Sequence, residues 1–346
     1  MQHRRPTLSP IVMALLALCL LCSACAKSAP AAAPAPSAPA DSVQESPAPV
    51  QVSPAPGPSS SPSPSPSPQP TPFSFVWMTD TQALSYHVPD ALDSMGDWIS
   101  AKIETENIIG VFHTGDIVDN GFKSWEWDNF DLALQKFRGK IPFYPVAGNH
   151  DIGVRAQNYE GYTHCDFLND FPPERKFGDG AVFYDLFSAG GTDFIVLGVG
   201  FDATRQFEGA FDWIDAVLQA HRDRVGIVLF HRYMDGKGET FKKSRENQER
   251  IVAAHPNVRL VLCGHSSGVS TRYESYDDDG DGTAERRVCA MMFNLKGSAS
   301  YGFLRLLRFD PLSRSIEIVT YSTYRDCYHV NRKTGESLDF TVEKGF

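Results

Sequence analysis

The chain has 346 residues and a net charge of −10, from 32 Lys and Arg against 42 Asp and Glu. Fifteen of its 24 prolines fall between residues 26 and 72, where the charged residues are Lys27, Asp41 and Glu45. Residues 1–25 carry +2 and residues 26–72 carry −1, so residues 73–346 must carry −11. This acidic balance disfavours a basic surface for binding nucleic acid. It leaves the oligomeric state open.

The first 24 residues have the three regions of an export signal. Two arginines give a basic start, and the apolar run from Ile11 to Leu21 is much shorter than the roughly 20 residues of a membrane-spanning helix. Small residues before Cys25 resemble the lipobox of bacterial lipoproteins, although Cys22 stands where Leu is usual. We therefore expect residues 1–24 to be a lipoprotein signal peptide and Cys25 to be lipidated. The protein is then exported and anchored to the outer face of the bacterial cytoplasmic membrane or to the cell envelope.

Residues 25–72 form a second segment, the lipidated cysteine followed by a disordered linker rich in Pro, Ser and Ala. The linker is either a semi-extended tether reaching on the order of 100 Å or a spacer of no set length. Residues 73–346 show neither an internal repeat nor a second linker, so we expect one domain outside the cytoplasm. Disulfide pairing stays open for its four cysteines, which are Cys165, Cys263, Cys289 and Cys327.

From residue 73 onward, short apolar runs alternate with amphipathic stretches, which predicts a layered α/β fold. The predicted strands are Phe75–Thr79, Ile108–Thr114, Phe143–Ala147, Val182–Phe187, Phe194–Val199, Val225–Phe230 and Val258–Cys263. The predicted helices are Pro89–Thr105, Trp125–Phe137, Ala210–His221 and Lys242–Ala254. Three further strands follow one another without helices, so the sheet is expected to finish antiparallel: Arg286–Phe293, Gly302–Phe309 and Ser315–Tyr321.

Polar residues follow five of these strands at the point where each strand ends. In chain order they are Asp80-Thr81-Gln82, Gly115-Asp116-Ile117-Val118-Asp119-Asn120, Gly148-Asn149-His150-Asp151, His231, and Gly264-His265-Ser266-Ser267. In open α/β folds the carboxyl edge of the sheet is where ligands bind. We therefore expect these side chains to share one edge.

The oxygen and imidazole groups of this set suit a pair of divalent metal ions. One carboxylate can bridge two ions about 3.5–4 Å apart, and a water between them becomes hydroxide near neutral pH. Glycines precede Asp116, Asn149 and His265, where they let the chain turn sharply and bring the ligands close.

Together these segments resemble the calcineurin-like metallophosphoesterase family, whose pattern is D-x-H, GD-x-x-D, GNH-D/E, a lone His and GH-x-H. The resemblance spans residues 76–267. It implies a metallophosphoesterase-type β-sandwich of two sheets flanked by helices, in the order αββα. It also implies a two-metal site that hydrolyses phosphomonoesters or phosphodiesters through in-line attack by metal-bound hydroxide.

The resemblance also assigns roles to single residues. Asp80 ligates the first metal, Asp116 bridges, and the second metal is completed by Asn149, His231 and His265. His150 lies beside the scissile phosphate as general acid or charge stabiliser, and Asp151 orients its ring.

Two positions depart from the family pattern. Gln82 stands where the first motif has His, and Ser267 stands where the last motif has its second His. Gln82 is expected to ligate through its amide oxygen, which leaves the first metal site weaker than the second. The ions themselves, Mn, Fe, Zn or Mg, are left open.

Substrate contacts are expected close to the site in sequence. Arg155 and Arg232 are candidate phosphate clamps. The segment Val154–Gly180 leaves directly from the third motif and is the candidate substrate-shaping loop.

Two other functions compete with the phosphoesterase reading. Gly264-His265-Ser266-Ser267-Gly268 fits the G-x-S-x-G elbow of serine hydrolases, with Asp326 and His329 following in the required order. The elbow must lead into a helix, whereas β-prone residues follow here. The other alternative is a surface-tethered lipoprotein that binds phosphate-containing ligands without turnover because its first metal site is degenerate.

Several further features have ordinary structural explanations. Asp277–Gly282 matches the first half of an EF-hand loop, but Val288 stands at position twelve, so a hairpin turn is favoured over weak calcium binding. Trp125 and Trp127 are expected to pack in a helix. His113 lies within a predicted strand and is expected to be structural.

Overall fold

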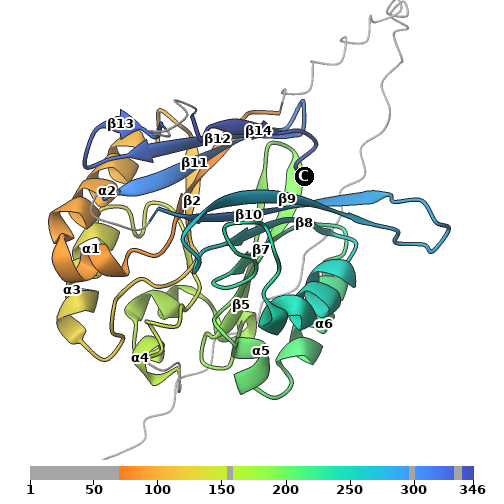
Figure 1. Ribbon diagram of the computed structural model, residues 1–346, viewed down its shortest axis with the longest axis horizontal. Helices are drawn as coiled ribbons and strands as arrows, with labels where there is room; N and C mark the ends of the chain where they lie inside the picture. Colours follow the sequence, from red (N-terminus) through yellow and green to blue (C-terminus); the bar gives the residue numbers. More distant parts are fainter. Residues whose placement is uncertain (1–69, 154–158, 296–300, 331–336) are drawn as a thin grey trace, which may run out of the picture. The chain divides into compact units, whose positions relative to one another are not determined.

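The computed structural model describes residues 70–153, 159–295, 301–330 and 337–346 (Figure 1). Within these residues the strands form two sheets of seven strands each. The first has the order β13-β12-β11-β1-β2-β3 with β14 on β12, and the second has the order β4-β5-β6-β7-β8-β10-β9. Helices flank the sheets, which confirms the predicted layered α/β sandwich.

The first sheet combines a parallel half with an antiparallel half. Its strands are β1 (Phe73–Met78), β2 (Ile108–His113), β3 (Phe143–Pro145), β11 (Phe303–Asp310), β12 (Ser315–Ser322), β13 (Cys327–Tyr328) and β14 (Phe340–Val342). Strands β1, β2 and β3 run parallel, whereas β11 is antiparallel to β1 and β12 is antiparallel to β11. The ends of β1, β2 and β3 therefore meet at one edge.

The second sheet has a parallel centre. Its strands are β4 (Lys176–Phe177), β5 (Val182–Ala189), β6 (Thr192–Val199), β7 (Val225–Phe230), β8 (Val258–Cys263), β9 (Gly268–Tyr276) and β10 (Arg286–Asn294). Strands β6, β7, β8 and β10 run parallel in that spatial order. The ends of β7 and β8 therefore also lie at one edge.

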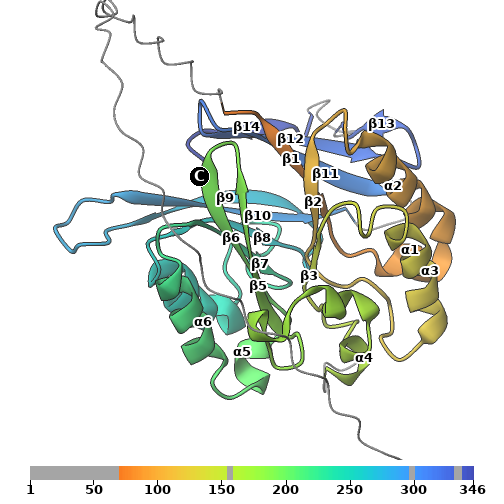
Figure 2. The same cartoon turned by 180° about the vertical axis from the view of Figure 1, so that it is seen from behind.

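Helices cover the outer faces of both sheets. They are α1 (Gln82–His87), α2 (Pro89–Lys102), α3 (Ser124–Leu134), α4 (Glu160–Thr163), α5 (Ala203–Gln206), α6 (Ala210–Ala220) and α7 (Arg245–Asn247). Figures 1 and 2 show α1, α2 and α3 beside the first sheet and α5 and α6 beside the second. Short 3₁₀ segments lie at Asp166–Asp170, Pro173–Arg175 and Lys242–Ser244, and a π-helical stretch lies at Gln248–Ala253.

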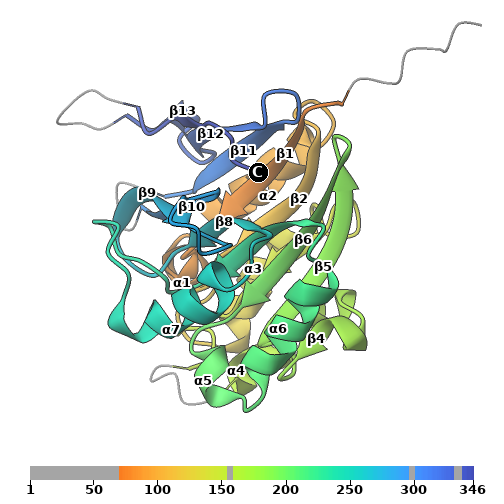
Figure 3. The ribbon, with the colours of Figure 1, turned by 90° about the vertical axis from the view of Figure 1, so that its right-hand side faces the viewer.

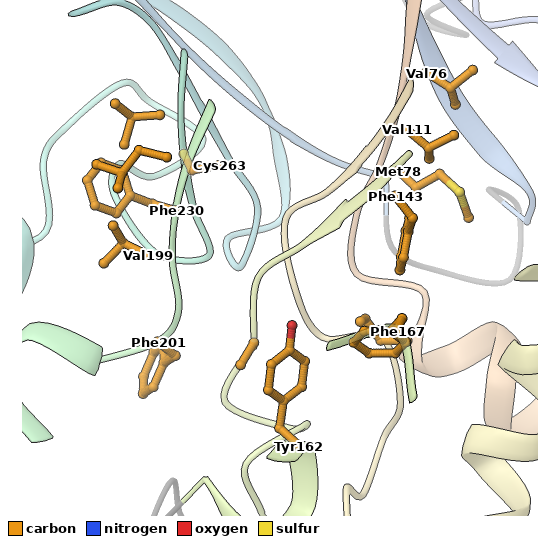
Figure 4. Close-up of a cluster of buried hydrophobic side chains, with 14 of the residues drawn as sticks. Val76, Met78, Val111, Phe143, Tyr162, Phe167, Val199, Phe201, Phe230 and Cys263 are labelled. Carbon is orange, nitrogen blue, oxygen red and sulfur yellow. The ribbon is translucent and has the colours of Figure 1, made fainter. Parts of the chain in front are cut away.

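The sheets pack face to face through aromatic side chains. Phe73 and Phe75 of β1 point to this interface because alternate residues of a strand face the same side. The rings of Phe73 and Phe194 lie 5.7 Å apart across it, and Figure 3 shows the two sheets from the side. A second set of buried strand residues packs on the other faces of the sheets, together with residues of the helices. Figure 4 labels Val76 and Met78 from the first sheet and Phe230 from the second.

One strand has a different partner from the one expected. Arg286–Phe293 was predicted to continue into the antiparallel strands that follow, but β10 lies in the second sheet, parallel to β8 and antiparallel to β9. The chain passes to the first sheet only after β10 ends. The predicted hairpin turn at Asp277–Gly282 is confirmed, because it joins β9 to β10. Weak calcium binding there stays the less favoured alternative.

Most of the predictions about export and lipid anchoring concern residues that the structure does not describe. Cys25, the signal segment, nearly all of the linker and Arg155 lie outside them. The four cysteines of the domain carry free thiols, and three of them are buried. Within the part of the chain that the structure describes, no helix has both the length and the hydropathy of a membrane span.

Candidate metal centre

The loops after β1 and β2 are joined by their backbones. The N–H of Asp80 donates to the carbonyl of Gly115, and the N–H of Gln82 donates to the carbonyl of Asp116, both at 2.9 Å. Asp80, Asp116 and His265 all have left-handed backbones, with φ of 49°, 53° and 70°. Residues with side chains adopt this region rarely, and such strain concentrates at functional sites. Three of the predicted ligands therefore have this strained backbone, which they share with six other non-glycine residues among those described.

Two of the predicted glycines are required by close packing between these loops. A Cβ at Gly148 would lie 2.1 Å from the backbone nitrogen of Asp116, and a Cβ at Gly264 would lie 2.3 Å from Oδ2 of Asp80. Both distances are far below contact distance. Only glycine lets the third and fifth motifs approach the first two, as the sequence predicts.

His231 stands at the centre of the site. Its buried ring has Nδ1 2.7 Å from the carbonyl oxygen of Thr114, which fixes Nδ1 as the donor. Its Nε2 lies 3.2 Å from Oδ1 of Asp116, 3.1 Å from Oδ1 of Asn149 and 3.1 Å from Nδ1 of His265. A backbone carbonyl that orients a ring in this way is typical of metal-ligating histidines. Four predicted ligands thus converge on one point.

The charges around His231 favour a cation. Burial alone lowers the pKa of His231, but the carboxylate of Asp116 outweighs it and raises that pKa to about 9. The same interaction holds the pKa of Asp116 well below its usual range in spite of its burial. Acceptor atoms this close need a positive charge between them, supplied by a proton or by a metal ion.

The other group of ligands offers only oxygen. Nε2 of Gln82 donates to Oδ2 of Asp116 at 3.2 Å, and its buried Oε1 has no hydrogen-bond partner among the described residues. Oδ2 of Asp80 accepts the hydroxyl of Thr79 at 2.7 Å and the N–H of His265 at 2.9 Å. An unpaired amide oxygen beside two carboxylates fits a hard cation.

The donor set therefore fits two divalent ions. Ligand atoms of Asp116, His231 and His265 lie within 4.8 Å of one another and would hold one ion together with Asn149. Asp80, Gln82 and the shared Asp116 would hold the other. Ser267, which replaces the family's histidine, is exposed.

His150 lies beside this centre with its ring oriented by another loop. Its N–H donates to Oδ1 of Asp116 at 3.0 Å. Its ring Nδ1 lies 2.8 Å from the carbonyl oxygen of Asp119 and 3.3 Å from that residue's Oδ1. About a third of the side chain, 35%, is exposed. With Nδ1 held as a donor, Nε2 is the ring nitrogen left for a substrate.

The role expected for Asp151 needs correction. Its carboxylate does not orient the ring of His150 but accepts three backbone N–H groups, from Ile117 at 2.8 Å, Val118 at 3.0 Å and Gly148 at 2.7 Å. Burial and nearby Asp116 raise the pKa of Asp151 to about 7, against the lowering effect of these donors. Asp151 therefore ties the second and third motifs together.

Sequence reasoning missed Asp119 as the residue that orients His150. The available signal was its position, as the second aspartate of the G-D-x-x-D motif. Glu126, in turn, accepts the N–H groups of Asp119 at 2.6 Å and Asn120 at 3.0 Å. No sequence pattern marks Glu126, because it is a buried acid on an otherwise amphipathic helix.

Of the two arginines predicted to contact substrate, the structure describes only Arg232. Arg155 lies outside the described residues. Arg232 pairs with Asp202 and stacks on the ring of Phe201 at 4.3 Å. That ring lies 5.9 Å from the ring of His231 and 5.7 Å from that of His265. Arg232 is thus separated from the ligand histidines by one aromatic ring.

The serine hydrolase alternative is contradicted by the fold. Strand β9 begins at Gly268, two residues after Ser266, whereas a nucleophile elbow needs a helix there. Asp326 accepts the hydroxyl of Tyr321, and the N–H of His329 donates to Thr320 on the first sheet. His113 is structural, as predicted, because its buried ring bonds Thr81 at 3.0 Å.

Comparisons with known proteins agree with this geometry. The model of the calcineurin-like phosphoesterase family matches residues 73–267. The uncharacterized protein YvnB of Bacillus subtilis (strain 168) is 34% identical over 72% of this chain, which spans 20% of that protein. A probable cyclic nucleotide phosphodiesterase of Moraxella catarrhalis (strain BBH18) is 27% identical over 46% of this chain and 58% of its own. The chain thus covers less than two thirds of either relative.

A solved structure shares the fold. The purple acid phosphatase PPD1 from yellow lupin seeds superposes with a TM-score of 0.53 at 15% identity, over 80% of this chain and 54% of its own. Members of this family typically bind two metal ions, and the family model covers all five motifs described above. The chain belongs to the calcineurin-like phosphoesterase family.

Proposed function

We propose that the chain hydrolyses phosphate esters, either monoesters or diesters, with two divalent metal ions held between the loops. One observation carries this proposal. Asp116, Asn149 and His265 each place a ligand atom within 3.2 Å of Nε2 of His231. When bound, such ions lower the pKa of water and neutralise phosphoryl oxygens.

His150 has the position of the general acid in this reaction. Its Nδ1 lies 2.8 Å from the carbonyl oxygen of Asp119 and 3.3 Å from the carboxylate of that residue, which together orient the ring. The proton on Nε2 is then directed to the leaving oxygen of the ester. Because the ring is partly exposed, a substrate can reach it.

The names of two similar proteins are consistent with this substrate class. The Moraxella relative is described as a probable cyclic nucleotide phosphodiesterase, and the lupin protein as a purple acid phosphatase. Both names refer to phosphate compounds, one a diester. We therefore propose a phosphate-ester substrate and leave the choice between mono- and diester to experiment.

Binding without turnover is the competing function. It is favoured by Ser267, which is exposed and replaces an imidazole ligand, and by the neutral amide of Gln82. One observation argues against a degenerate first site. The Oε1 atom of Gln82, which has no hydrogen-bond partner among the described residues, is buried beside Asp116, where it can serve as a ligand.

The N-terminal features support a proposal about location. The protein is exported, lipidated at Cys25 and held at the membrane by that lipid, with residues 26–72 as linker. Mass spectrometry of the N-terminal peptide should find an acylated Cys25. A Cys25→Ser variant should be released from membranes, and retention of that variant would contradict the proposal.

A panel of phosphate esters with Mn, Mg, Zn, Fe and Ca tests the function. Hydrolysis should need added metal and should stop on exhaustive chelation. Ser266→Ala should retain full activity, because the reaction uses no serine nucleophile. Activity that survives chelation would overturn the metal-dependent proposal, and metal and phosphate binding without turnover would establish the competing one.

A further inference from the structure

A second charged site lies at the opposite end of the strands that carry the histidines. A cavity of about 710 Å³ opens where α6 ends and β7 and β8 begin, elements that are labelled in Figure 1. His231 and His265 follow the other ends of these strands. Six residues of strand span roughly 20 Å, so this cavity is separate from the metal centre.

The cavity is basic although the chain is acidic. Four arginines line it, and the acid that lines it is Asp223: the arginines are Arg222, Arg224, Arg259 and Arg314. The lining therefore carries +3, from four arginines minus one aspartate, on a chain whose net charge is −10. A local field of this sign concentrates anions.

Two of these arginines are held in place by backbone carbonyls. Arg259 donates to the carbonyl of Pro256 at 2.9 Å, and Arg224 donates to those of Phe187 and Phe194 at 3.4 and 3.3 Å. Asp193 is 3.9 Å from Arg224. Burial and the repulsion from Arg286 and Arg314 lower the pKa of Arg259. These two guanidinium groups are thus held in place, and the charge of Arg224 is partly balanced by Asp193.

The other two arginines of the cavity, Arg222 and Arg314, are exposed. Among the residues that the structure describes, no carboxylate pairs with the guanidinium of Arg222 or of Arg314. The backbone of Arg314 is nevertheless fixed, because its carbonyl accepts the N–H of Gly345 at 2.7 Å. The cavity thus brings together guanidinium groups from the α6–β7 loop, β8 and the β11–β12 turn.

We propose that this cavity binds the phosphate groups of an anion that carries two or three negative charges, such as a diphosphate. Arginine forks match phosphate oxygens. A tetrahedral phosphate offers oxygens to several arginines at once, whereas a planar carboxylate offers two. A charge of about −3 balances the +3 of the lining. The inference is independent of the proposed hydrolysis.

Calorimetric titration of the chelator-treated protein with inorganic pyrophosphate tests this site. The variant Arg222→Gln/Arg314→Gln should bind at least about tenfold more weakly, since each charged hydrogen bond contributes on the order of tenfold or more. Both residues are exposed, so the fold should persist. The variant Lys102→Gln/Lys140→Gln, which loses two charges outside the cavity, should bind like the unmodified protein.

A second measurement separates this site from the metal centre. Hydrolysis of a small aryl phosphate should be unchanged in Arg222→Gln/Arg314→Gln, so the two proposals fail independently. Flotation with phosphatidylcholine vesicles that hold or lack phosphatidic acid tells whether the anion is a lipid headgroup or soluble. Absent pyrophosphate binding, or equal binding by both double variants, would overturn the proposal.

Discussion

The two sheets supply different kinds of ligand to one centre. Loops after β1, β2 and β3 of the first sheet provide oxygen, from two aspartates, one glutamine and one asparagine. Loops after β7 and β8 of the second sheet provide imidazole nitrogen, from His231 and His265. Both imidazoles meet at Asp116, where Nε2 of His231 is 3.2 Å from the carboxylate. Two ions bound here would therefore have different ligands: one ion would have both nitrogen and oxygen ligands, and the other would have oxygen ligands alone.

The strongest test of this comparison removes the ligand shared by both groups. Asp116→Asn should lower kcat/KM by about a thousandfold or more, since both ions lose a charged ligand. Metal analysis should show a matching loss of bound ions. Asp119→Asn changes a carboxylate in the same loop that is not a metal ligand. This variant should keep its metal, and its kcat/KM should fall only about tenfold. Equal losses in both variants would contradict a bridging Asp116.

The next test concerns His150, which lies in the loop after β3 and is not expected to bind metal. His150→Ala should lower turnover of alkyl phosphate esters by about 10²–10⁴-fold and that of activated aryl esters much less, because good leaving groups need little protonation. Metal content should not change. His164→Ala provides a control histidine outside the site. Loss of metal in His150→Ala would instead make His150 a ligand.

The inequality between the two ions is tested at Gln82. Calorimetry should resolve two metal-binding events of different affinity. Gln82→His should tighten the weaker event about tenfold by supplying nitrogen, and Gln82→Leu should weaken it similarly by removing the oxygen. Ser267→His should change it little, because position 267 is exposed. Two equally tight events in the unmodified protein would refute the inequality.

The smallest expected effect is on the stability of the metal-free protein. The folded pKa of His231, about 9, lies above its unfolded value near 6.5. The pairing of His231 with Asp116 therefore contributes its full stabilisation of the folded state below about pH 6.5. This contribution is lost as the pH rises through 9. Asp116, with a depressed pKa, keeps its contribution throughout this window.

Thermal unfolding should thus show a drop in Tm of a few degrees between pH 6.5 and 9. Loading with metal should remove the drop, because an ion then replaces the proton beside His231. An identical slope with and without metal would show that this pair does not control the pH dependence.

The strands next to the site were the most predictable elements. β7 and β8 match their predicted bounds because both faces are buried, so every residue of Val225–Phe230 and Val258–Cys263 except Gly226 and Arg259 is apolar. β4 and β13 have two residues each and no periodicity to detect. The predicted helix Lys242–Ala254 is helical but changes from 3₁₀ to α to π, and nothing in its sequence explains this change.

The ligands of the centre were predictable because they follow strands. Parallel strands bring their ends together, so Asp80 could be placed with Asp116 at the edge of the first sheet. His231 follows a strand of the second sheet, so the ligands share two sheet edges instead of the single edge expected, and only the family resemblance placed His231 with the two aspartates. The contacts of His150 depend on how the second and third loops fold against each other. The sequence therefore could not decide which of two nearby aspartates orients the ring of His150. In the structure Asp119 orients the ring, whereas Asp151 accepts backbone N–H groups.

The buried carboxylate of Asp151 joins two of the loops that carry the candidate ligands. Its three N–H bonds close the second loop onto the third with groups that belong to the protein alone. In small zinc domains the ion itself drives the chain to fold. Here hydrogen bonds within the protein connect the two loops, so we expect them to help hold the ligand positions without a bound ion. We therefore expect metal ions to be removed and replaced without unfolding, so that the same polypeptide can be loaded in turn with different ions.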